Sequence, residues 1–211
     1  NLLCYLYNIN MAMRLTLTNM FQFISALSPL LLGFYLVINS IIEQNIKGLI
    51  YLAGSILASI INIILMNFIE SPKSLNASSI CNIIEVPYAG TTLNLYNSPA
   101  LNSTFIGFTI SYLYYPMNQK GIVNYNLMLI LLILFGIDAI SQVTNKCTNY
   151  AGVVFGGLLG SLLGYFWYTT ISRNSESLVY LNTTSGNELV CNKLKKTRMK
   201  CRKRAVPDEF K

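Results

Sequence analysis

Asp138 is the residue of this 211-residue chain whose position points most directly to chemistry. It lies within the apolar run from Ile122 to Ser141 and is the only charged residue inside such a run. Acidic side chains inside a membrane are costly and usually have a functional or paired role. Two interpretations stay open for Asp138. It could carry a proton or cation, or it could be an interfacial acid, near the end of its span, that is hydrogen-bonded to its neighbours.

The chain contains no histidine. This excludes general acid–base catalysis by histidine, a Ser–His–Asp triad and a zinc site built on imidazole. The five cysteines form no CxxC pair, so the sequence offers neither a redox motif nor a cysteine-based metal site. We therefore expect no metal centre and no cofactor.

Two pairs of cysteines are candidates for disulfide bonds. Cys81 and Cys147 fall in two loops that are expected on the same, non-cytoplasmic face, where either a disulfide or two free thiols is chemically reasonable. Cys191 and Cys201 flank a basic cluster near the C-terminus. A cytoplasmic location would favour free thiols there, whereas a disulfide would close a small basic loop.

The net charge of +7 is confined to one end of the chain. Residues 1–192 hold six basic and six acidic residues, whereas residues 193–211 hold nine basic and two acidic ones. Such a cluster beside a membrane attracts anionic lipid headgroups, and it could equally bind nucleic acid or an acidic capsid protein. Alternatively, the tail binds no partner and only sets the orientation of the chain in the membrane. The candidate binding residues are Lys193, Lys195, Lys196, Arg198, Lys200, Arg202, Lys203 and Arg204.

The composition identifies the environment in which these residues must be positioned. The chain is 53% hydrophobic and 11% charged, whereas soluble domains carry about 25% charged residues. A soluble enzyme and a disordered chain are therefore both disfavoured. The uncharged stretches predict five membrane spans, and residues 2–18 could form a sixth, interfacial helix. The predicted spans are residues 15–42, 48–69, 101–117, 122–141 and 150–172.

These spans predict an all-α, polytopic membrane bundle of five to six helices within residues 1–172, followed by a basic tail, residues 173–211. With five spans, the loop formed by residues 70–100 and the tail lie on opposite faces. Twelve basic residues fall on the tail's face and three on the other. Since positive charge is retained on the cytoplasmic side, we expect the tail in the cytoplasm.

The last predicted span contains a repeat of glycines. Gly152, Gly156, Gly160 and Gly164 recur every four residues and fall close to one helix face. Such a face lets the backbone of a second helix approach closely, which favours helix packing in a membrane.

Three motifs in this chain resemble the type 2 phosphatidate phosphatase superfamily. The segment from Ser141 to Gly160 resembles the third signature of that family, in which Ser-Arg, a histidine, Asp-Val and spaced glycines follow one another. The segment Ser98-Pro99-Ala100-Leu101-Asn102 resembles its Pro-Ser-Gly-His helix start, and Glu70-Ser71-Pro72 resembles the Arg-Pro of its first signature. The resemblance covers roughly residues 48–170 and implies a phosphatase-like helix bundle.

The resemblance also implies that the chemistry of the family has been lost. Those enzymes use cations to neutralise phosphate, a histidine to attack phosphorus and a His–Asp pair to move protons. None of these groups stands at the matching positions in this sequence, so we expect no catalytic residue. The degenerate site positions are Ile64, Ser71, Ala100, Asn102, Gln142, Thr148 and Gly152.

A second resemblance concerns the run from Tyr88 to Thr148 and the spacing of Cys191 and Cys201. Both are similar to a membrane protein of large nucleocytoplasmic DNA viruses. We therefore expect a non-enzymatic structural component of a viral inner membrane or of a membrane derived from the endoplasmic reticulum. The alternatives are a residual lipid-phosphate phosphatase or lipid-headgroup binder, and a small transporter. The missing histidines argue against the first, and the scarcity of polar spans argues against the second.

Overall fold

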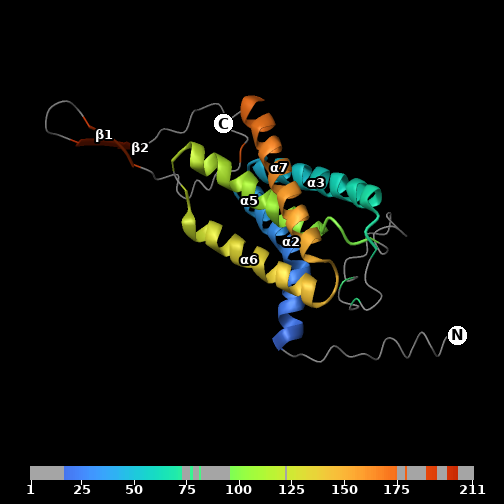
Figure 1. The fold of residues 1–211 in the computed structure, drawn as a ribbon. Helices are drawn as coiled ribbons and strands as arrows, with labels where there is room; N and C mark the ends of the chain where they lie inside the picture. Colours follow the sequence, from blue (N-terminus) through green and yellow to red (C-terminus); the bar gives the residue numbers. More distant parts are fainter. Residues whose placement is uncertain are drawn as a thin grey trace. The chain divides into compact units, whose positions relative to one another are not determined.

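The computed structural model describes residues 17–72, 77, 81, 96–121, 123–174, 179, 189–193 and 199–203. The chain divides into two compact units, Asn1–Tyr180 and Leu181–Lys211. Within its described residues, the first unit consists of five α-helices (Figure 1). These are α2 (Leu17–Ile42), α3 (Lys47–Ile69), α5 (Leu101–Gln119), α6 (Tyr125–Thr144) and α7 (Tyr150–Asn174).

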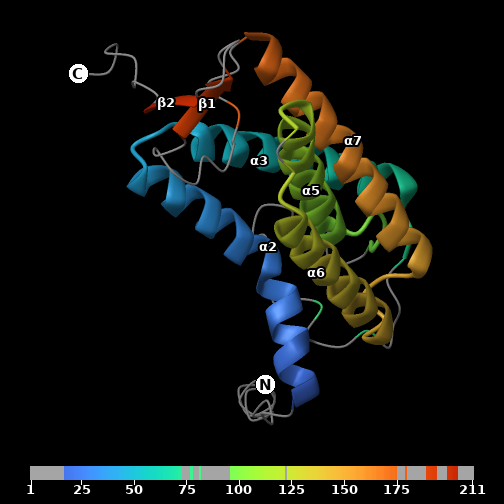
Figure 2. The same cartoon turned by 90° about the vertical axis from the view of Figure 1, so that its left-hand side faces the viewer.

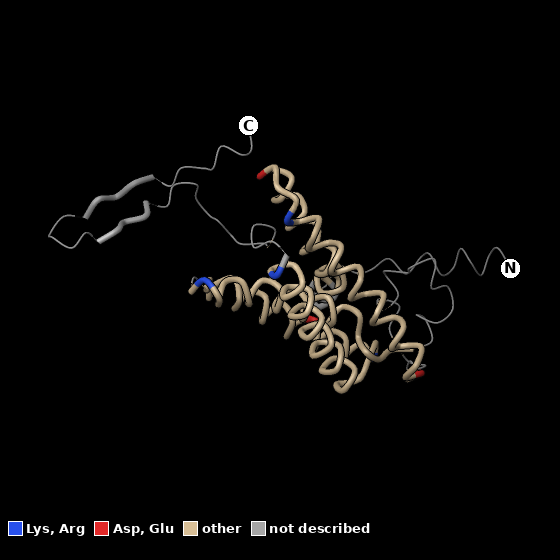
Figure 3. The backbone as a smooth tube through the Cα atoms, turned by 90° about the horizontal axis from the view of Figure 1, so that it is seen from above, with Lys and Arg blue, Asp and Glu red and all other residues tan. Residues whose placement is uncertain are grey.

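Four of the described helices are long and apolar enough to cross a membrane, which confirms the prediction of a multi-pass α-helical membrane protein. The apolar segments are Phe23–Ile42, Lys47–Ile69, Tyr125–Thr144 and Tyr150–Arg173. Large hydrophobic side chains cover their outer surfaces, as contact with lipid requires. Charged residues lie mostly at helix ends (Figure 3): Lys47 begins α3, and Arg173 lies in the last turn of α7.

Two predicted boundaries of the helical unit were wrong. The fourth span was expected over residues 122–141, but α6 is Tyr125–Thr144 because the side chain of Asn124 accepts a hydrogen bond from the Leu127 amide, at 3.1 Å, and caps the helix there. The helical unit also continues past the expected boundary at residue 172. Helix α7 ends at Asn174, and Val179 is buried within the hydrophobic core.

Helix α5 is the central helix of the unit, although its composition is the least apolar. It contacts α2, α3, α6 and α7 (Figure 2). More than half of its side chains are buried. Because other helices shield it from lipid, α5 can carry polar residues that a lipid-facing helix could not. Its buried polar residues are Ser103, Thr104, Thr109 and Ser111.

Helices α5 and α7 run parallel and pack directly backbone to backbone. A Cβ atom built on Gly156 would lie 2.6 Å from the Ala100 carbonyl oxygen, and one on Gly160 would lie 2.0 Å from that of Thr104. The same step repeats between Gly164 and Phe108, at 2.5 Å. Three glycines of the predicted repeat thus face α5. Helix α5 therefore follows the apolar helix α7 in register over these three steps, although α5 itself is not among the four helices apolar enough to cross a membrane.

Aromatic side chains form the centre of the core between α3 and α5. The rings of Tyr51, Phe108 and Tyr112 lie 5.8–6.0 Å apart, and the hydroxyl groups of Tyr51 and Thr109 are hydrogen-bonded at 2.7 Å. Trp167 of α7 donates a hydrogen bond to the Ile50 carbonyl at 3.1 Å. This layer fixes α3 against both parallel helices.

The described part of the second unit is an antiparallel hairpin of β1 (Leu189–Lys193) and β2 (Met199–Lys203). Cys191 is paired directly with Cys201 in the strand register. Four of the predicted anion-binding residues belong to these strands: Lys193, Lys200, Arg202 and Lys203. The other four, Lys195, Lys196, Arg198 and Arg204, lie outside the described residues.

Candidate functional site

The carboxylate of Asp138 is the centre of a buried polar cluster that joins three helices. Its Oδ1 accepts hydrogen bonds from the Ser25 hydroxyl of α2, at 3.0 Å, and from the Asn102 amide of α5, at 3.4 Å. Its Oδ2 accepts one from the Ser103 hydroxyl, at 3.3 Å, and another from the amide of Gln142, one helical turn further along α6. The Asp138 side chain is fully buried.

Asp138 is hydrogen-bonded to its neighbours, as one of its two interpretations expects. Helix α6 continues beyond it as far as Thr144. Packing of α2 and α5 against α6 removes the carboxylate from both lipid and water. Four hydrogen-bond donors replace the lost solvation of this acid.

Ser25 reaches Asp138 from a locally modified part of α2. Pro29 has no amide hydrogen, so the Ser25 carbonyl lacks its usual partner within the helix. The hydroxyl of Ser28 donates a hydrogen bond to this carbonyl instead, at 2.8 Å. The proline is thus accommodated without an unpaired backbone group, and the Ser25 hydroxyl is left to bind Asp138.

The structure brings together most of the degenerate positions at one end of the helical unit. Asn102 and Gln142 both donate to Asp138, as described above, and Gln142 also donates to Ser103 at 3.3 Å. The Ala100 amide donates to the carbonyl of Gly152 at 3.0 Å. These contacts join the beginning of α5 to the end of α6 and the beginning of α7.

Ser71 and Thr148 meet at one backbone segment beside this cluster. The Ser71 hydroxyl donates to the Asn97 side chain at 3.1 Å, and the Thr148 hydroxyl donates to the Asn97 carbonyl at 2.7 Å. The Thr148 hydroxyl is thus engaged in a structural hydrogen bond. Gly152 differs from the other glycines of the repeat, because the atom nearest to a Cβ built there belongs to the turn before α7 and not to α5. That atom is the Thr148 hydroxyl oxygen, at 2.3 Å.

Ile64 does not belong to this site. Its side chain is 49% exposed on α3 and faces outward like the other large hydrophobic residues of that helix. Ile64 therefore does not lie beside the other degenerate positions, where its resemblance to a catalytic lysine had placed it. The residue of α3 that points inward nearby is Asn62, whose amide donates to the Thr104 hydroxyl at 2.6 Å.

The described cluster consists of neutral polar groups around one acid. Among the described residues, each side chain that hydrogen-bonds to the Asp138 carboxyl group is neutral. Among the described residues, no group of three His, Cys, Asp or Glu side chains is arranged to hold a metal ion. Residues Ser71 and Gln142, at the positions that resemble the phosphate-binding arginines, supply no positive charge.

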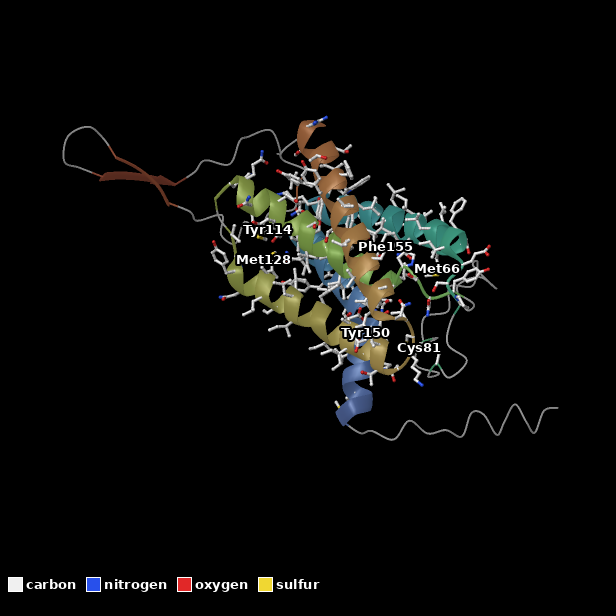
Figure 4. All side chains as sticks on the ribbon, viewed as in Figure 1. Met66, Cys81, Tyr114, Met128, Tyr150 and Phe155 are labelled. Carbon is white, nitrogen blue, oxygen red and sulfur yellow. A yellow bond between two sulfur atoms is a disulfide. The ribbon has the colours of Figure 1, made fainter. Side chains whose placement is uncertain are left out.

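A disulfide bond joins Cys81 to Cys147 near the same end of the unit. Figure 4 shows Cys81 close to Tyr150, which begins α7, whereas Met128 lies toward the opposite end. The bond ties the segment between α3 and α5 to the turn between α6 and α7. For Cys191 and Cys201 only the backbone pairing is described, so both alternatives, a disulfide and two free thiols, stay open.

Sequence reasoning missed Ser25, Ser103 and Asn97. Ser25 carried a usable signal, because Ser25, Ser28 and Pro29 interrupt an otherwise apolar span. Ser103 is next to Asn102, and its role follows only from the way α5 faces α6. Asn97 binds through its backbone and its side chain, and no pattern in the sequence marks it.

No protein-family model, no curated protein and no solved structure matches this chain. The phosphatase resemblance therefore rests on the motif residues themselves.

Proposed function

We propose that this chain is a non-enzymatic structural membrane protein that carries a basic tail at one membrane face. The observation that carries the proposal is the hydrogen bonding of the degenerate positions to one another's neighbour, Asp138. Asn102 and Gln142, at positions that resemble a catalytic histidine and arginine, are hydrogen-bonded to the chain's own Asp138. A site whose polar groups satisfy one another offers no cation for phosphate and no nucleophile. Its place in a viral membrane is supported by the sequence resemblance alone.

The disulfide supports an orientation for this scaffold. Disulfides persist in oxidising compartments, so the face that carries Cys81 and Cys147 is proposed to be non-cytoplasmic. If α5, α6 and α7 all cross the bilayer, the residues after α7 emerge on the opposite face. The positive-inside rule points the same way. The basic tail would then lie in the cytoplasm.

The crossing of α5 can be tested with two matched positions. Glu70 and Lys120 are exposed residues directly after α3 and α5. Each would be replaced by cysteine in a background with Cys4, Cys191 and Cys201 changed to serine. We expect an impermeant maleimide to label only one of the two in sealed vesicles, and both after permeabilisation. Equal labelling in sealed vesicles would show that α5 does not cross.

The tethering role predicts a loss of binding when charge is removed from the tail. The full chain, reconstituted in nanodiscs of neutral lipid, should bind anionic vesicles. Neutralising four bases should weaken this binding about a thousandfold, because each base near an anionic surface contributes about 1 kcal/mol. The test variant carries glutamine at Lys195, Lys196, Arg202 and Lys203. Its control carries glutamine at the uncharged tail positions Asn182, Thr183, Thr184 and Asn187.

Salt and the choice of surface identify the partner. Electrostatic binding should weaken steeply as the screening length shortens from about 10 Å at 0.1 M salt to about 3 Å at 1 M. Equal binding of the charged and neutralised chains, or equal binding to neutral vesicles, would contradict a tether. Tighter binding to duplex DNA than to anionic lipid would assign the tail to nucleic acid instead.

A further inference from the structure

The hydrogen bonds around Asp138 are divided evenly over its two oxygens. Ser25 and Asn102 donate to Oδ1, whereas Ser103 and Gln142 donate to Oδ2. We infer that these four donors of α2, α5 and α6 form an anion-binding cluster that Asp138 occupies from within the chain, and that the cluster can hold a small free carboxylate once the Asp138 carboxylate is removed. The inference concerns this cluster and does not depend on the proposed role of the tail.

The groups of this cluster are suited to an anion. Two amide groups and two hydroxyl groups converge on the carboxylate from three different helices, which gives each oxygen two donors. Asn102 and Ser103 lie in the first turn of α5, and the N-terminal end of a helix carries partial positive charge. Donors and helix end together stabilise a buried negative charge without a basic residue.

The same geometry disfavours a metal cation as the partner of Asp138. A cation site would present oxygen atoms toward the ion, whereas here the amide groups of Asn102 and Gln142 present their nitrogen atoms to the carboxylate. In a neutral acid the carboxyl hydroxyl would donate to the Ser25 or Ser103 oxygen, which can accept, and one of the four observed hydrogen bonds would be reversed. The ionised carboxylate is the form that accepts all four hydrogen bonds.

Removing the carboxylate should leave a vacancy that a free anion can fill. The variant Asp138→Ala keeps the Cβ atom and lacks only the carboxylate, so formate is the matching probe. In full-length protein in detergent, we expect a lower unfolding temperature than in the wild type and a dose-dependent recovery of several degrees with formate. Acetate should restore Asp138→Gly, which has room for its methyl group, better than it restores Asp138→Ala.

Three controls separate this inference from general effects of salt and stability. Formate should not raise the unfolding temperature of the wild type, because Asp138 already occupies the site. Thr109→Ala removes a different buried hydrogen bond, the one to Tyr51, and should be destabilised without recovery in formate. Asp138→Asn keeps the shape of the side chain but places an amide NH₂ group where one carboxylate oxygen accepted hydrogen bonds. This variant should be less stable than the wild type, and formate should not restore its unfolding temperature.

Several results would overturn the inference. Recovery of Thr109→Ala by formate, or no recovery of Asp138→Ala, would remove the anion site. A wild type stabilised by sodium but not by potassium or choline would make the cluster a cation site. Equal stability of Asp138→Asn and wild type would show that the acid is neutral.

A double-mutant cycle keeps the test decisive should Asp138→Ala fail to fold even in formate. Ser25→Ala removes one of the four donors. We expect Ser25→Ala to lower the unfolding temperature clearly when Asp138 is present. In the Asp138→Asn background the loss should be much smaller, because the Ser25 hydroxyl no longer has a charged partner there. Equal losses in both backgrounds would contradict the inference.

Discussion

Replacing Gly160 by leucine is expected to destabilise the helical unit by about 3 kcal/mol or more. The Cβ alone would lie 2.0 Å from the Thr104 carbonyl oxygen and 2.8 Å from the Phe108 amide nitrogen. Both are backbone atoms of the central helix, so neither can move away without displacing α5. The measurement is equilibrium unfolding of the purified chain in detergent.

Gly136 supplies the matched control for this substitution. It lies in the middle of α6, and a Cβ built there meets no atom within 4 Å. Leucine also has a better helix propensity than glycine, so Gly136→Leu should be neutral or slightly stabilising. Gly157→Leu should be intermediate, because its Cβ would lie 2.8 Å from the end of the Phe135 ring, which can rotate or shift. A larger loss at Gly157 than at Gly160 would contradict this assignment of faces.

Loss of the Cys81–Cys147 disulfide is expected to destabilise the protein by about 2–4 kcal/mol. The bond links residues 66 positions apart and therefore restricts a long loop in the unfolded chain. The double variant Cys81→Ser, Cys147→Ser should unfold at lower temperature or lower denaturant concentration than the wild type. A reductant should lower the stability of the wild type to the same value.

The double variant is its own control for the effect of reductant. With both cysteines removed, a reductant should change nothing further in the helical unit. In a background with Cys4, Cys191 and Cys201 changed to serine, the protein should migrate differently with and without reductant on a denaturing gel only when Cys81 and Cys147 are present. Free thiols at both positions in freshly prepared protein, measured by alkylation and mass spectrometry, would show that the bond does not form.

The sequence alone predicted most of the helical architecture for a simple reason. Helices that contact lipid must be apolar over a whole crossing, so gaps between charged residues located α2, α3 and α7 closely. The glycine repeat identified a packing face, because close backbone contact requires the absence of side chains. These are local constraints, and each is contained in a single stretch of sequence.

The tertiary structure decided the features that depend on more than one helix. The sequence could not show that α5 is the central helix, since its polar residues are tolerated only because its neighbours cover them. It could not show that packing buries Asp138 completely, and it grouped Ile64 with the site although the side chain of Ile64 faces outward.

The partners of Asp138 are the clearest case. Ser25 lies 113 residues from it in the sequence and becomes its neighbour only when α2 packs against α6. A buried charge takes its donors from whichever helices surround it, and that arrangement is a property of the assembled bundle.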